Sequence, residues 1–169
     1  MLFRSQEARR LAALWSDEGD EADDAEGGES TTLIQCAERI LAMGCEYVLV
    51  TGTHENTQQV INTLYNEDGL VSTESWPRLP GQYHGSGCTL ASAIAATIAN
   101  GLPMAEAVKD AQEYTWQTLR AGFRAGMGQH IPDRLFWARE EAQVAEDGAN
   151  KDESKKSDES NTSNDRDSA

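Results

Sequence analysis

Basic residues, cysteines and long apolar runs are all scarce in this 169-residue chain. Only 14 lysines and arginines stand against 29 aspartates and glutamates, and no basic run could neutralise a nucleic-acid backbone. No apolar stretch reaches the roughly 18 residues of a membrane-spanning helix, and the N-terminus lacks the apolar core of a signal peptide. These absences argue against a nucleic-acid partner and against a membrane protein.

Cysteine and histidine are also too few and too scattered for a structural framework. Three cysteines, an odd number, argue against a disulfide scaffold and indicate a reducing compartment. His54, His84 and His130 lie far apart, so no cluster has the ligand spacing of a zinc site. We therefore expect a soluble cytoplasmic protein.

Acidic residues are in excess in this chain, and most of them lie in two segments. The formal net charge is −15 at pH 7. Segment 17–30 holds eight acidic residues and no basic one, and segment 140–169 holds ten acidic and four basic residues. We expect a folded domain over residues 1–139 that carries a solvated acidic insertion at 17–30, followed by a disordered acidic tail at 140–169. The insertion could alternatively contact a basic partner.

The pattern of the first half predicts alternating helix and strand. A short helix is expected from Ser5 to Trp15, and a second begins at Thr32, where Thr-Leu-Ile-Gln resembles a capping box with Gln35. Residues 47–51 then form a continuous apolar run, which is typical of a strand buried on both faces. A helix followed closely by such a strand favours an α/β fold with a parallel sheet.

The second half predicts a hairpin and two further helices. Two extended segments, 60–65 and 70–76, flank the turn-forming residues 66–69. Residues 90–100 form an alanine-rich stretch that is apolar nearly all round, so we expect a central, buried helix. A last helix is expected to start at Pro103 and run to about residue 122.

The segment that precedes the alanine-rich helix is the first candidate site. Gly85, Ser86 and Gly87 let the backbone come close to a ligand, and the free amides and dipole of a helix start favour a phosphate there. The segment is not a Walker loop, since Gly-Lys-Ser/Thr is missing. A merely structural tight turn is the alternative.

Cys88 falls in the first turn of the same helix, where the positive end of the helix dipole stabilises a thiolate. It could accept a proton from a substrate hydroxyl or act as a nucleophile. A buried, inert thiol is the alternative.

The second candidate site follows the buried strand. Ligands of open α/β sheets bind beyond the carboxyl ends of strands. Thr51 and Gly52, which lead into Thr53 and His54, could there contact nucleotide phosphates. An ordinary strand-to-loop turn is the alternative, and His54 has no visible Asp or Ser partner for a catalytic triad.

Taken together, these segments resemble the C-terminal half of the hydroxymethylpyrimidine/phosphomethylpyrimidine kinases, thiamine-biosynthesis enzymes of the ribokinase-like superfamily. The most specific piece is segment 84–90, HGSGCTL, with the alanine-rich helix after it. Many ribokinase-like enzymes carry Gly-Ala-Gly-Asp here, and cysteine in place of that aspartate is typical of the pyrimidine kinases. Segments 50–54, 76–80 and 126–132 are also similar to bacterial members.

The resemblance implies a three-layer α/β/α fold built on a parallel sheet. It also implies transfer of the ATP γ-phosphate, with Mg²⁺, to the hydroxymethyl group of the pyrimidine and then to its monophosphate. By the same resemblance, Gly85, Ser86 and Gly87 would form the anion hole, with Cys88 nearest the proton being removed. Further site residues implied by it are Thr51 and Gly52 for the nucleotide and Glu7 for the metal.

The chain departs from the family pattern in three respects. Everything before roughly the middle of a family member is absent, the acidic stretch from Asp17 is foreign, and Arg4 stands where the Asn of an Asn-x-x-Glu motif is expected. Half a sheet would leave a strand edge and apolar helix faces uncovered. A homo-oligomer or a complementing N-terminal half could cover them. The alternatives for function are a pyridoxal-kinase-like vitamin kinase and a catalytically dead nucleotide-binding or interaction module.

Overall fold

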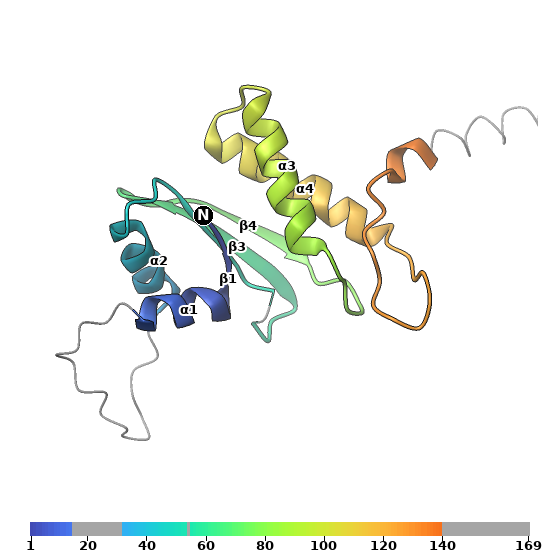
Figure 1. Cartoon of the computed structure of the whole chain (residues 1–169), viewed down its shortest axis with the longest axis horizontal. Helices are drawn as coiled ribbons and strands as arrows, with labels where there is room; N and C mark the ends of the chain where they lie inside the picture. The colour runs from blue at the N-terminus through green and yellow to red at the C-terminus, as the bar shows by residue number, and fades with distance from the viewer. Residues whose placement is uncertain (15–31, 54, 140–169) are drawn as a thin grey trace, which may run out of the picture.

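The computed structural model describes residues 1–14, 32–53 and 55–139, and in it two pairs of helices enclose a sheet (Figure 1). Within these residues the strands are ordered β1 (Leu2–Arg4), β2 (Val48–Thr51), β3 (Gln59–Asn66) and β4 (Gly69–Pro77). β1 is parallel to β2, but β2, β3 and β4 pair in antiparallel register. The predicted parallel pairing is therefore found only between β1 and β2, because the later connections are too short for a parallel crossover.

Helices α1 (Ser5–Leu14) and α2 (Leu33–Ala42) cover one face of the sheet (Figure 1). The predicted capping box starts α2: the Gln35 amide donates to Thr32 Oγ1 at 3.3 Å, and the Thr32 amide donates to Gln35 Oε1 at 2.9 Å. Ala8, Ala37 and Ile40 form the core of this layer, and none of the three is exposed. Their small or branched side chains pack both helices directly onto β2.

Strand β2 is buried along its whole length, as the apolar run predicts. Val48 and Val50 point into the core under α1 and α2, whereas Leu49 points into a second core with Leu64 of β3. The alternation of side chains along a strand explains how three successive residues, Val48, Leu49 and Val50, serve both cores.

Strands β3 and β4 form the predicted hairpin. Their turn consists of Glu67 and Asp68, and Gly69 follows with φ of 111°, a backbone conformation that favours glycine. Asn66 Oδ1 accepts from the Asp68 amide at 3.1 Å and so closes the turn locally.

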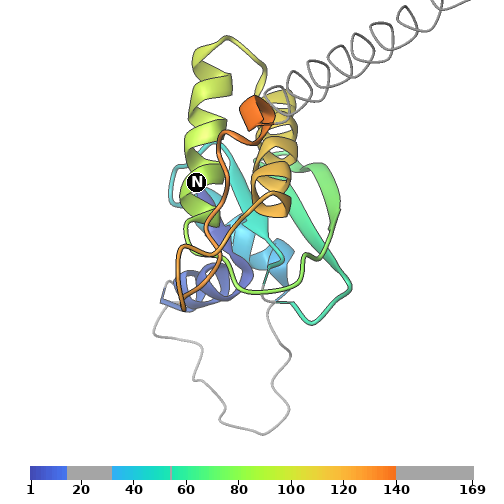
Figure 2. The same cartoon turned by 90° about the vertical axis from the view of Figure 1, so that its right-hand side faces the viewer.

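Helices α3 (Ser86–Ala99) and α4 (Met104–Arg120) lie side by side on the opposite face of the sheet (Figure 2). The expectation of a buried α3 is wrong: only Thr89 and Leu90 are buried, and Ile98 is 39% exposed. The helix touches the sheet through its first turns and α4 along one side, and no described element covers the remainder. Because α3 is apolar nearly all round, its uncovered side is an exposed apolar face.

The segment after α4 returns to the beginning of α3. The Phe123 amide donates to the Ile131 carbonyl at 3.1 Å, and the His84 amide donates to the His130 carbonyl at 2.8 Å. None of the helices in the described part is long and apolar enough to cross a bilayer. The expectations for segments 17–30 and 140–169 and for His54 fall outside the described residues.

Candidate active site

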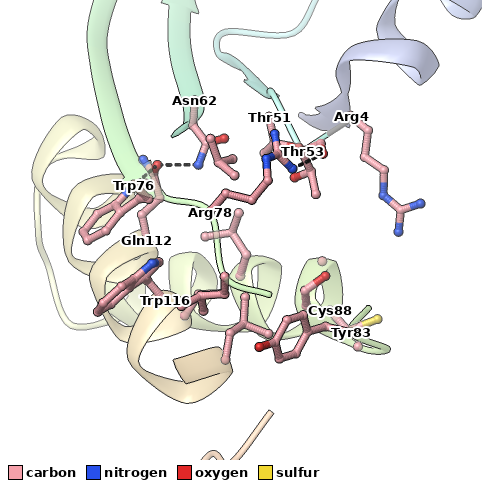
Figure 3. A pocket seen from close by; sticks show the side chains of 18 of the residues that line it. Arg4, Thr51, Thr53, Asn62, Trp76, Arg78, Tyr83, Cys88, Gln112 and Trp116 are labelled. Carbon is pink, nitrogen blue, oxygen red and sulfur yellow. Dashed lines mark hydrogen bonds between the residues drawn. The ribbon is translucent and has the colours of Figure 1, made fainter. Parts of the chain in front are cut away.

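A cavity of about 940 Å³ opens where the ends of β1 and β2 approach the beginning of α3 (Figure 3). Trp76 of β4 and Trp116 of α4 line another part of it. The cavity collects predicted site residues from three separate parts of the sequence, namely Glu7, Thr51, Gly85, Ser86, Gly87 and Cys88. Residues that are far apart in the chain thus share one solvent-accessible space.

The N-terminus of α3 presents unpaired amides to this cavity. Gly85 is the N-cap with φ of 87°, and it has no side chain that could cap the helix. The first helical hydrogen bond runs from the Thr89 amide to the Gly85 carbonyl at 2.9 Å. The amides of Ser86, Gly87 and Cys88 precede it and find no acceptor in the part of the chain that the structure describes. These amides and the helix dipole form a site suited to an anion.

An arginine that sequence reasoning missed lies beside this helix start. Arg134 Nε donates to Thr89 Oγ1 at 3.1 Å. Its Nη2 lies close to Gly85, 3.3 Å from the position that a Cβ on this glycine would occupy. The guanidinium adds positive charge next to the unpaired amides. Arg134 and Thr89 are 45 positions apart in the sequence, so no local sequence pattern predicts their contact.

Cys88 lines the cavity from the first turn of α3. The residue is exposed and its thiol is not in a disulfide, so the alternative of a buried packing thiol does not describe it. Its role in proton transfer stays a prediction.

The two residues expected to bind nucleotide after β2 differ in their position relative to the cavity. Thr51 lines the cavity, whereas Gly52 does not. The Gly52 amide donates to the Ile61 carbonyl at 2.9 Å and to Asn62 Oδ1 at 3.2 Å. A Cβ on Gly52 would stand 2.5 Å from the Ile61 carbonyl oxygen, so this position needs glycine for close approach to β3. The phosphate-binding role of both residues stays a prediction.

Buried amide side chains support the loop from the sheet side. Asn62 Nδ2 donates to Gln112 Oε1 at 2.8 Å, and Trp76 Nε1 donates to the same oxygen at 3.2 Å (Figure 3). Trp76 stacks on Trp116 with 6.1 Å between ring centroids. Loop, sheet and α4 are thus joined by one polar network beside an aromatic pair.

Burial raises the pKa of the Tyr83 phenol, which also lines the cavity. The hydroxyl donates to the Pro80 carbonyl at 3.2 Å, and the ring lies 5.4 Å from that of His130. Tyr83 therefore stays neutral at physiological pH and connects the approach to α3 with the segment that follows α4.

Residues 19–133 match the phosphomethylpyrimidine kinase family. The chain belongs to this family. It is 35% identical over 102 residues to the hydroxymethylpyrimidine/phosphomethylpyrimidine kinase of Rhizobium meliloti, covering 60% of this chain and 38% of that one. The enzyme of the same name from Mycobacterium tuberculosis is 33% identical over 131 residues, covering 75% and 47%. The chain thus spans less than half the length of these family members.

Solved structures support the fold that the family implies. Pyridoxal kinase from Staphylococcus aureus, in complex with AMP-PCP and pyridoxal, superposes with a TM-score of 0.65 at 21% identity, over 79% of this chain and 47% of that one. An ADP complex of Bacillus subtilis pyridoxal kinase gives a TM-score of 0.60 at 24% identity, over 79% and 47%. The predicted ribokinase-like α/β/α class is confirmed.

The resemblance predicts a metal role for Glu7, at the start of α1, with Arg4 in the position where an Asn is expected. The Arg4 amide donates to Glu7 Oε2 at 3.0 Å, and the two side chains lie 3.8 Å apart as an ion pair. Glu7 is the only carboxylate that lines the cavity among the described residues. A single carboxylate together with phosphate oxygens and water is a normal donor set for Mg²⁺, so the chemistry of the site fits this ion. The metal role of Glu7 stays a prediction.

Proposed function

We propose that this cavity binds ATP and transfers its γ-phosphate to the hydroxymethyl group of hydroxymethylpyrimidine and of its monophosphate, as a step of thiamine biosynthesis. The observation that carries the proposal is the start of α3, where three unpaired amides share one cavity with Thr51 and an exposed thiol. Such an arrangement stabilises charge that develops on a transferring phosphoryl group. Three free cysteines agree with a cytoplasmic setting.

In this mechanism the substrate hydroxyl lies between the γ-phosphate and Cys88. The Cys88 thiolate accepts the hydroxyl proton as the oxygen attacks the γ-phosphorus and the bond to the β-phosphate oxygen breaks, which releases ADP. The amides of Ser86 and Gly87 hold the equatorial phosphate oxygens during transfer. Mg²⁺, when bound beside Glu7, supplies positive charge that reduces repulsion between the phosphates and the attacking oxygen.

The strand-end loop holds the other end of the polyphosphate. Thr51 offers a hydroxyl from the end of β2, and Thr53 lines the same cavity two residues later. Gly52 shapes this turn through its approach to β3. The nucleotide then runs from this loop towards α3, which places the γ-phosphate at the helix start.

The site requires a further polypeptide surface to enclose the substrate. The cavity is lined by β1, the edge strand of the described sheet, and by the first turns of α3, whose exposed face continues along the same helix. A complementing N-terminal half of a kinase, or a second copy of this chain, would cover these surfaces and exclude water from the reaction.

A pyridoxal-type alcohol is the second candidate substrate. The chain is 29% identical over 92 residues to the pyridoxine kinase of Bacillus subtilis, and solved neighbours include complexes with pyridoxal. The anion site does not select the alcohol, because it contacts only the phosphoryl group. A nucleotide-binding module without catalysis is the remaining alternative.

The test uses the purified chain with Mg-ATP and hydroxymethylpyrimidine phosphate, with the diphosphate product followed by mass spectrometry. Pyridoxal serves as the competing acceptor in a parallel reaction. Formation of the pyrimidine diphosphate supports the proposal, and phosphorylation of pyridoxal alone favours the second candidate. ATP binding without product from either acceptor would identify a nucleotide-binding module.

A further inference from the structure

Arg78, directly after β4, reaches back to the strand-end loop and donates to the backbone of four loop residues (Figure 3). Its Nε donates to the Thr57 carbonyl at 2.7 Å and its Nη1 to the Thr53 carbonyl at 2.8 Å. Its Nη2 lies 2.7 Å from the Glu55 carbonyl and 3.5 Å from that of Gly52. The loop therefore curves around one guanidinium group.

This geometry requires an arginine. A guanidinium presents five N–H groups in a rigid planar fork, whereas a lysine ammonium presents three from a single point. Because the guanidinium is charged, its hydrogen bonds to these carbonyls are stronger than those of a neutral donor. Lysine at position 78 could keep the charge and still lose most of the contacts.

Other anchors fix only part of the loop. The Gly52 amide is held by β3, and the Glu55 carboxylate pairs with Arg9 of α1 at 2.9 Å. The carbonyls of Thr53 and Thr57 both bond to Arg78. The Thr57 hydroxyl also donates to the Gln59 carbonyl at 2.5 Å. Among the described residues Arg78 bonds to four positions of the loop, so we expect it to contribute most to the loop's shape beyond Gly52.

We propose that Arg78 is the positioning residue of the nucleotide site. It holds residues 52, 53, 55 and 57 after β2 so that Thr53 lines the cavity beside Thr51, and it brings a positive charge to the cavity wall. The inference rests on the proposed function for the identity of the ligand, a nucleoside triphosphate. Arg78 acts through the loop and not by touching the reacting atoms.

The experiment compares Arg78→Ala and Arg78→Lys with the wild-type chain, with Arg124→Ala as a matched control at an exposed arginine. Hydrogen exchange of the nucleotide-free protein reports on the loop through the amides of Glu55 and Thr57, which donate to loop carbonyls at 3.1 and 2.9 Å. Isothermal titration gives the Kd for Mg-ATP.

We expect both Arg78 variants to speed exchange at these two amides and to raise the Kd for Mg-ATP about tenfold or more, since several hydrogen bonds to a charged group are lost. Exchange in β2 and the Arg124→Ala protein should stay as in wild type. Wild-type affinity in both Arg78 variants would overturn this inference and leave the proposed function standing. A wild-type chain that binds no adenine nucleotide would overturn both.

Discussion

The thiol at position 88 is the residue on which the proposed chemistry depends most directly. Replacing it with alanine removes the proton acceptor but leaves the backbone amides of α3 in place. Cys88→Ala should therefore lower kcat about 10²- to 10⁴-fold, the usual contribution of a general base, while the Kd for Mg-ATP stays close to that of wild type.

Single-turnover kinetics and titration on the same preparation would separate these two effects. Cys45→Ala, which removes a thiol bonded to the Ile40 carbonyl away from the cavity, is the matched control. Equal losses in transfer and binding for Cys88→Ala would assign the residue a packing role instead.

Gly52 illustrates how a residue placed at a site can act through packing. Gly52→Ala puts a methyl group 2.5 Å from the Ile61 carbonyl oxygen, so β2 and β3 must separate locally. We expect the free energy of unfolding to fall by about 1–3 kcal/mol, as for other overpacked positions, measured by urea denaturation. Gly126→Ala, where the added carbon meets nothing within 4 Å, should change it little. No difference between the two variants would contradict the close packing at Gly52.

At the scale of single elements, local signals in the sequence predict structure well. The capping box at Thr32, the all-buried strand β2 and the turn before Gly69 are formed as expected. The capping box and the turn are decided by residues within a few positions of one another, so a pattern in the sequence contains the whole interaction. The burial of β2 depends on α1, α2 and β3, and its continuous apolar run indicates only that the strand suits such a position.

Features decided by distant partners were not predictable in this way. The contacts of Arg78 with the loop cross 21 to 26 residues, and that of Arg134 with Thr89 crosses 45. The burial of α3 was predicted wrongly because apolar composition indicates what a helix could bury, not whether a neighbour is present. The sequence predicts the candidate site because its backbone features, the glycines and the helix start, are local. The side chains that support the site come from distant parts of the sequence, so no local pattern predicts them.

The capping box gives a prediction for α2. Thr32→Ala leaves the amide of Gln35 without its hydroxyl acceptor, so the free energy of unfolding should fall by about 1 kcal/mol. Chemical denaturation followed by circular dichroism measures this loss, with the exposed mid-helix change Glu38→Ala as the control. A loss no larger than that of the control would show that the box contributes little.

For the whole molecule, the exposed face of α3 is the least usual feature. The helix contains no charged residue, and Ile98 and its alanine neighbours are open to solvent. Such a surface favours association. We expect the purified chain to sediment as larger species as its concentration rises, and Ile98→Lys to shift it towards monomer without altering its circular dichroism. A concentration-independent monomer in the wild type would contradict this.

The network around Gln112 couples the cavity to a natural chromophore. The Gly52 amide is bonded to Asn62, Asn62 to Gln112, and Gln112 to the indole nitrogen of Trp76. A displacement of the loop therefore alters the surroundings of an indole ring through two intervening side chains. Trp76 also lines the cavity, so its emission is expected to respond, without any label, both to a nucleotide that enters and to a displacement of the loop.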